Sequence, residues 1–102
     1  MADVKQARKA VIARILEGEG KTAQAQRRAA FDDAELSEPL RTLVHKVATH
    51  AHDVSTHDIA AARESGLSED EIFEIVVCAA IGQATRQHDT ALAALDAATN
   101  GK

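Results

Sequence analysis

The sequence has little cysteine, proline or aromatic content. Its 102 residues include one Cys, one Pro, two Phe and no Trp or Tyr. A single cysteine excludes a disulfide framework within the chain, a multi-cysteine zinc or iron–sulfur site, and a dithiol redox centre. So few aromatic rings argue against a nucleic-acid binder that stacks bases on several exposed side chains. The length favours a single domain over residues 1–102, with one modest core.

Excess positive charge and long apolar runs are also missing. Sixteen Asp and Glu against twelve Lys and Arg give a formal net charge of −4, which provides no general attraction to nucleic acid. The longest uncharged run, residues 75–85, is far shorter than the ~20 residues of a membrane span. The first residues do not form the apolar stretch of a signal peptide. We therefore expect a cytoplasmic protein without membrane or nucleic-acid partners. The basic residues cluster early in the chain, and we interpret them as solvated helix faces: Lys5, Arg8, Lys9, Arg14, Arg27 and Arg28.

Alanine and helical periodicity are what the sequence has in abundance. Apolar residues recur at three- and four-residue spacing, and no window alternates as a strand does. The pattern predicts an all-α bundle of about five helices. We expect helices over residues 4–17 and 22–31, a third after an N-cap at Ser37, a short fourth from Ser55 to about residue 65, and a long last one. Ser55 and Ser68 begin sequences typical of capping boxes, and Gly66 is expected in a left-handed conformation between them.

The last helix is apolar on nearly all sides over residues 72–82. A helix with so little polar surface has to be central in the fold or lie at an interface between subunits. Gly82 within it indicates close packing or a kink. This helix provides more apolar surface than a monomer of this size needs to bury, mainly through Ile72, Ile75, Val76 and Ile81. We therefore expect a homo-oligomer that associates through this C-terminal helix.

Residues 36–98 resemble a known family. The segment Leu-Ser-Glu-Pro-Leu-Arg-Thr-Leu-Val is followed by an alanine-rich helix that ends in Ala-Arg-x-x-Gly-Leu-Ser-x-x-Glu-Ile, and then by an apolar helix. This order is similar to the carboxymuconolactone decarboxylase and AhpD-like alkylhydroperoxidase superfamily. The resemblance implies an AhpD-like all-α bundle that forms dimers, trimers or hexamers. It also implies a core over residues 36–98 and an N-terminal helical arm over residues 1–33.

The resemblance further implies that the redox chemistry of the peroxidase branch is lost. That branch has Cys-x-x-Cys at positions that correspond to Ala51 and Val54. A histidine follows near His57, and a glutamate precedes near Glu38. Peroxide reduction of this type needs one thiolate that attacks and a second that resolves. The chain's own Cys78 lies in the apolar helix, where we interpret it as a small buried hydrophobe.

Three functions stay open at this point. The first is a non-redox oligomeric protein with a binding or structural role, with no cofactor and with a small molecule as candidate ligand. The second is a cysteine-independent enzyme of the decarboxylase type. In it His57, His50 or His88 acts as acid or base on a small carboxylate or lactone held by Arg86 or Arg63. The third is a metal site made by the histidines of residues 45–57. Their spacing matches no established site, so no metal is assigned.

Overall fold

The computed structural model describes residues 2–100 and the side chains of residues 6–99. This part of the chain forms five α-helices and one short 3₁₀ helix, with no strand: α1 (Ala2–Glu17), α2 (Gln24–Asp32), α3 (Leu40–Thr49), η1 (Ala51–Asp53), α4 (Thr56–Glu64) and α5 (Glu69–Asn100). The predicted all-α class and the long last helix are confirmed. None of these helices combines the length and the hydrophobicity of a membrane-crossing segment.

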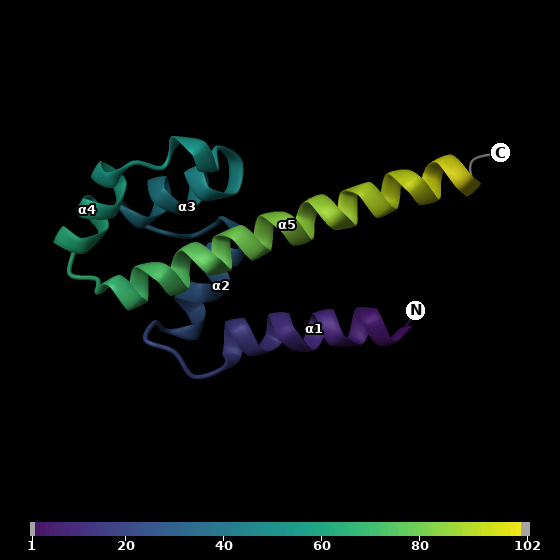
Figure 1. Ribbon diagram of the computed structural model, residues 1–102, viewed down its shortest axis with the longest axis horizontal. Helices are drawn as coiled ribbons and strands as arrows, with labels where there is room; N and C mark the ends of the chain where they lie inside the picture. The colour runs from purple at the N-terminus through teal and green to yellow at the C-terminus, as the bar shows by residue number, and fades with distance from the viewer. Residues whose placement is uncertain (1, 101–102) are drawn as a thin grey trace.

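The long helix α5 is the axis of the molecule. It crosses nearly the whole view in Figure 1, with α3 and α4 on one side of its first half and α2 behind it. Helix α1 runs antiparallel to α5, so that it starts at the end of the molecule where α5 finishes (Figure 1). The radius of gyration is 15.6 Å, against about 13 Å for a compact domain of this length. The chain is therefore elongated.

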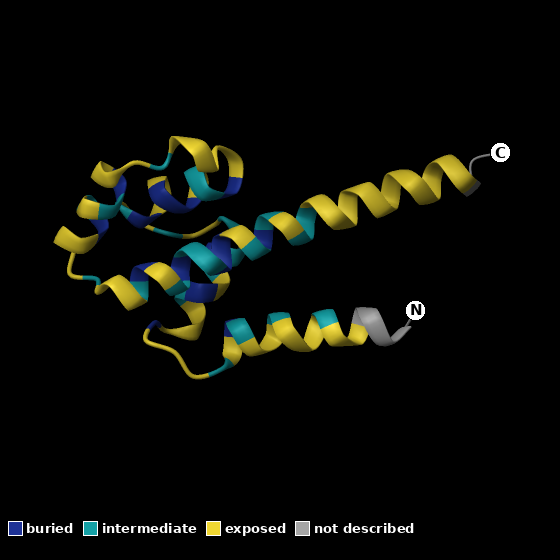
Figure 2. Ribbon diagram, viewed as in Figure 1, coloured by how far each residue is buried: buried dark blue, intermediate teal, exposed yellow. Residues whose placement is uncertain are grey.

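The core lies where the first half of α5 meets α2, α3 and α4. Four of its larger side chains are fully buried: Leu43, Val44, Ile75 and Cys78. Leu16 of α1 and Ala30 of α2 belong to the same cluster, so the helices before residue 36 share the core of those after it. Figure 2 shows the buried positions gathered in this half of the molecule, whereas α5 is exposed throughout residues 87–99.

Local hydrogen bonds fix the starts of α4 and α5. The Ser55 hydroxyl accepts the Asp58 amide at 3.3 Å, and the Asp58 carboxylate accepts the Ser55 amide at 2.9 Å, which is the predicted capping box. Ser68 and Glu71 form the same reciprocal pair at the start of α5. Gly66 lies between the two helices with φ at 107°, in the left-handed region as expected.

The predicted N-cap at Ser37 is wrong. Pro39 occupies the N-cap position of α3, and its side chain offers no hydrogen bond to the helix. Because the helix begins two residues later than expected, a longer side chain is needed to reach its first turn. The Glu38 carboxylate performs this role and accepts the Thr42 amide at 2.9 Å. Ser37 contributes only its carbonyl oxygen, which accepts the Arg41 amide at 3.0 Å.

The end of α2 lies directly against the backbone of α5 at Gly82. A Cβ atom at this position would lie 1.9 Å from the carbonyl oxygen of Phe31. The same oxygen accepts a hydrogen bond from Nη1 of Arg86, one turn further along α5. Arg86 therefore satisfies a carbonyl that the last turn of α2 leaves without a partner in its own helix. Of the two roles expected for Gly82, the structure shows close packing.

We expect Gly82→Ala to destabilise the protein by about 1–3 kcal/mol, because the added methyl group forces α2 away from α5. This outcome opposes the helix propensity of alanine, which exceeds that of glycine by about 1 kcal/mol. The midpoint of thermal unfolding should fall by at least about 4 °C. Ala60→Gly, at an exposed position in the middle of α4, is the control and should lose about 1 kcal/mol. A Gly82→Ala protein as stable as the original would contradict the close approach.

Candidate functional site

The four candidate acid–base residues lie apart. Glu38 precedes α3 and His50 follows it, so a helix of 10 residues, about 15 Å long, separates them. His57 is in the first turn of α4 with an exposed side chain. His88 lies on the exposed second half of α5. No cavity described below is lined by more than one of these residues.

The histidines have local partners. Nδ1 of His50 lies 2.9 Å from the Thr49 hydroxyl, and its ring meets the ring of His52 edge-on at 6.2 Å between centroids. Nδ1 of His88 contacts Nη1 of Arg8. Within residues 6–99, no group of three or more His, Cys, Asp or Glu side chains is placed to hold a metal ion. The geometry therefore gives no support to a metal site at residues 45–57.

Ala51 and Val54, where the resemblance places the cysteines of the peroxidase branch, lie in the connection between α3 and α4. Ala51 begins η1 and is exposed, whereas Val54 is half-buried and packs against the core. Cys78, in α5, is only 1% exposed, and burial raises the pKa of its thiol. A buried thiol with a raised pKa is a poor nucleophile. The expected role of Cys78 as a small core side chain is confirmed.

Asp58, the residue after His57, is the carboxylate that joins α3 to α4. It is 9% exposed, it accepts the amide and the hydroxyl of Ser55, and its two oxygens accept Nζ of Lys46 at 3.0 and 3.1 Å. The Ser55 amide, followed by the Lys46 ammonium, holds the pKa of Asp58 below its usual value. This ion pair holds the connection that contains η1.

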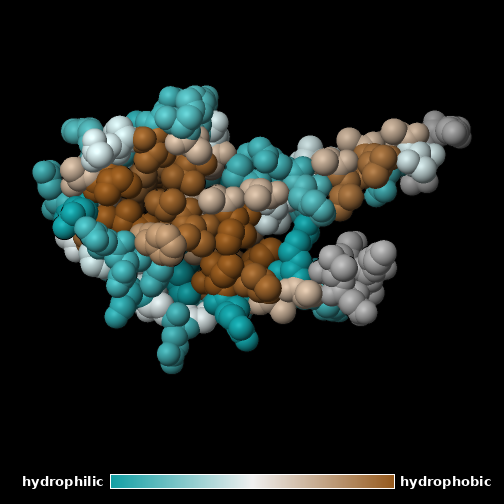
Figure 3. All heavy atoms as spheres, in the orientation of Figure 1, coloured by the Kyte–Doolittle hydropathy of each residue, from teal (hydrophilic) through white to brown (hydrophobic). Residues whose placement is uncertain are grey.

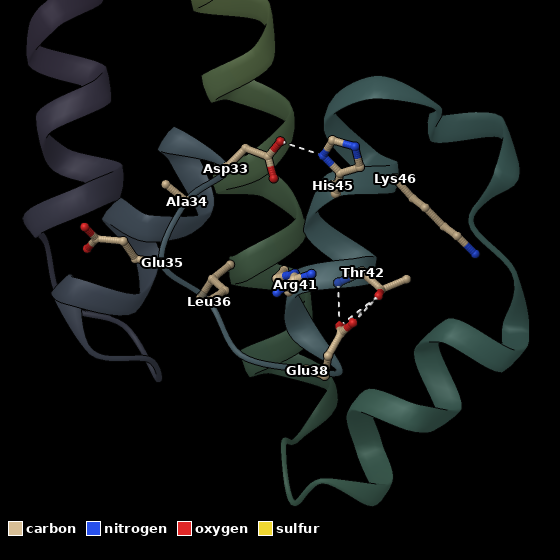
Figure 4. Close-up of a pocket in the computed structure, with 9 residues that line it drawn as sticks. All are labelled: Asp33, Ala34, Glu35, Leu36, Glu38, Arg41, Thr42, His45 and Lys46. Atoms are coloured by element: carbon tan, nitrogen blue, oxygen red, sulfur yellow. Dashed lines mark hydrogen bonds and ion pairs between the residues drawn. The ribbon is translucent and has the colours of Figure 1, made fainter.

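A groove of about 480 Å³ lies between α3 and the segment that joins it to α2 (Figure 4). Its charged groups are largely paired already. Nδ1 of His45 lies 2.9 Å from Oδ2 of Asp33, and Glu38 accepts the hydroxyl and the amide of Thr42. These bonds, the hydroxyl first, hold the pKa of Glu38 below its usual value. Glu38 is therefore a weak base, which is unfavourable for a proton relay. Figure 4 shows Lys46 pointing away from the groove.

The two arginines proposed as anion anchors interact with the protein itself. Nη1 of Arg86 donates to the Phe31 carbonyl, and its Nη2 donates to the side chain of Gln83 at 3.2 Å. Nη1 of Arg63 pairs with Glu69 at 3.1 Å across the turn between α4 and α5. The Arg63 pair is exposed and contributes little to stability. The hydrogen bond from Arg86 to the Phe31 carbonyl joins α5 to α2, so Arg86 has a structural role.

Arg27 is a site residue that sequence reasoning missed, because it was placed on a solvated helix face. That expectation is wrong for this residue. Arg27 is 5% exposed, and its Nη1 donates to the Ile15 carbonyl in the last turn of α1 at 2.8 Å. Arg28, next to it, is exposed and pairs with Glu17 at 3.1 Å. The sequence holds one sign that Arg27 is buried. Ala30, a small apolar residue, lies three residues later on the same helix face.

Comparison of the chain with protein-family models, curated proteins and solved structures finds no match. Function is therefore inferred below from the surfaces and cavities of the chain itself.

We expect Asp58→Asn to reduce stability near neutral pH and to lose this effect in acid. The pKa of Asp58 in the folded state is below the value of about 3.9 for an unfolded chain. Its ionised form therefore adds stability that is complete above that pH and is lost as the pH falls through the folded-state value. Urea unfolding of the two proteins should differ at about pH 7 and converge below about pH 3.

Glu64→Gln is the matched control for this series, since Glu64 is an exposed carboxylate at the end of the same helix. It should change stability by less than about 0.5 kcal/mol throughout. A difference between Asp58→Asn and the original protein that stays constant down to about pH 2 would show that the ion pair with Lys46 contributes nothing.

Proposed function

We propose that this protein is a non-redox, homo-oligomeric member of the AhpD-like superfamily with a binding or structural role, and that a second copy of the chain covers the exposed half of α5. The sequence similarity over residues 36–98 supports the family, and the all-helical fold agrees with it. The side chains at Ala51 and Val54, together with the burial of Cys78, support the loss of dithiol chemistry.

The exposed area of the chain is the observation that carries the proposal. The chain exposes 6998 Å². A folded monomer of 10.8 kDa is expected to expose about 5,500 Å². The excess of roughly 1,500 Å² is larger than the ~800 Å² that one partner buries in a standard interface. A standard interface with one further copy of the chain would cover about half of this excess.

The second half of α5 contributes to this excess. Every residue over 87–99 is exposed, and Leu92 and Leu95 expose 38% and 61% of their surface. Figure 3 shows hydrophobic surface on this extension, separate from the broad hydrophobic area over the packed half. An isolated helix of this length is marginal in water. The extension therefore gains stability when a partner packs along it.

One face of α5 has the spacing of a helix–helix contact. Its positions alternate by four and three residues, as in a coiled coil. We call this face the α5 seam, and it consists of Ala84, Gln87, Ala91, Ala94 and Ala98. All of these residues are exposed. Because alanine lets two helices approach closely and the seam has no charged residue, a second α5 is a suitable partner.

The cysteine-independent enzyme has less support. It needs a histidine close to an arginine that is available for an anion. The candidate histidines, His50, His57 and His88, lie apart from one another. The candidate arginines already bind groups of the protein, since Arg63 pairs with Glu69 and Arg86 donates to the Phe31 carbonyl.

We expect light scattering at ~100 μM protein to give the mass of an oligomer. Ala91→Glu places a charge in the seam and should shift the mass toward that of a monomer. Ala93→Glu introduces the same charge on the opposite, equally exposed face of α5 and should leave the mass unchanged. A monomer for the original protein at this concentration would refute the proposed assembly.

We expect no cysteine-dependent peroxidase activity. With a thiol reductant and an organic hydroperoxide, the original protein and Cys78→Ala should give the same background rate, because the thiol is buried and has no second cysteine to resolve an oxidised form. Turnover that disappears in Cys78→Ala would contradict the loss of redox chemistry.

A further inference from the structure

We propose that a cavity beside Arg27 binds a small organic carboxylate with an apolar body. The cavity has a volume of about 230 Å³ and lies between the α1–α2 loop and the first half of α5. This inference rests on the binding role proposed above, although the site lies within one chain. The residues that carry the argument are Ile15, Arg27, Phe73, Glu74, Val77 and Cys78.

Arg27 has an unused edge of its guanidinium group. Nη1 donates to the Ile15 carbonyl. Nε is buried and has no hydrogen-bond partner, the only such side-chain atom within residues 6–99. Nη2, which lies on the same edge as Nε, makes no hydrogen bond to the described residues either. A buried donor without a partner is unfavourable, and this edge has the geometry that matches the two oxygens of a carboxylate.

Glu74 also lines the cavity, but the α1–α2 loop already uses its carboxylate. Its oxygens accept the amides of Lys21 and Thr22 and the Thr22 hydroxyl at 2.7 to 3.0 Å. Burial acts to raise the pKa of Glu74, but these hydrogen bonds together hold it below its usual value. A Cβ at Gly20 would lie 2.9 Å from Oε1, so the loop fits closely around this carboxylate. The loop donors are neutral groups, and the nearby Arg27 guanidinium is the positive charge that acts on Glu74. The two residues form no hydrogen bond, so the edge of Arg27 that carries Nε is left for a ligand.

Part of the remaining wall suits an apolar ligand body, and the charged side chains of Arg14 and Glu19 line the rest of it. Ile15, Val77 and the exposed ring of Phe73 contribute hydrocarbon surface. Burial raises the pKa of the Cys78 thiol, which therefore stays neutral and does not repel an anion. An apolar cavity of about 150 Å³ is sufficient for benzene. The volume of about 230 Å³ therefore fits a single aromatic ring, or a short aliphatic chain, with its carboxylate at Arg27.

Benzoate is a suitable probe, with benzamide as its neutral isostere. In ¹H–¹⁵N NMR titrations of the full chain, benzoate should shift the Nε–H signal of Arg27 and the amide signal of Cys78. Its dissociation constant should be at least about tenfold lower than that of benzamide, because hydrogen bonds between charged groups are about twice as strong as neutral ones. Equal binding of the two probes, or an Arg27 signal unchanged by ~50 mM benzoate, would overturn the proposal.

Two adjacent arginines provide matched variants. Arg27→Gln should weaken benzoate binding at least about tenfold, and Arg28→Gln, outside the cavity, should leave it unchanged. Equal effects of the two substitutions would contradict the site. Should Arg27→Gln fail to fold, the comparison of benzoate with benzamide on the original chain decides the question without it. Light scattering of the same samples separates the two proposals: a monomer that binds benzoate refutes the assembly alone, and an oligomer that does not bind it refutes the site alone.

Discussion

The carbonyl oxygen of Phe31 lies against Gly82, and the other helices are arranged around this contact between two backbones. It places α2 across α5 at a distance that any larger side chain would prevent. Arg86 then donates to the same oxygen and holds the end of α2 in position. With α2 fixed, the loop before it reaches α5, where Glu74 accepts the amides of Lys21 and Thr22. The cavity beside Arg27 is thus a product of the packing that builds the core.

The two halves of α5 have different tasks. The first half supplies the core and one wall of the Arg27 cavity, and the second half extends beyond the rest of the chain. Cys78 shows how the chemistry of the chain differs from that of the redox branch of the proposed family. Its sulfur is a neutral part of the packing, and the unsatisfied polar group nearby is a guanidinium. A site of this kind recognises charge and shape and does not transfer electrons.

The features that sequence predicted well depend on a few neighbouring residues. The capping boxes at Ser55 and Ser68 and the left-handed Gly66 are local, so their signals survive without knowledge of the fold. The close packing at Gly82 was one of two outcomes that the sequence left open. The burial of Arg27 depends on how the end of α1 meets α2, and the buried Ala30 three residues later is only a weak local sign of it.

The histidines illustrate the same limit. Four of them are close together in sequence, but α3 ends at Thr49, η1 turns the chain, and α4 starts in a new direction. The four side chains therefore do not converge: His45 meets Asp33, and His50 meets Thr49 and the ring of His52. Proximity in sequence becomes proximity in space only along one continuous helix face, and this segment has three short elements instead.

The unequal covering of α5 makes its two halves respond differently to dilution. Residues before Gly82 are held by contacts within the same chain, and their stability does not depend on how much protein is present. Beyond Asp89, which Arg8 still contacts, the described residues are exposed, so in the proposed assembly their order would follow mass action with other copies. As the protein is diluted, the helix would shorten from its C-terminal end while the core stays folded. The length of α5 would then report the local concentration of the chain itself.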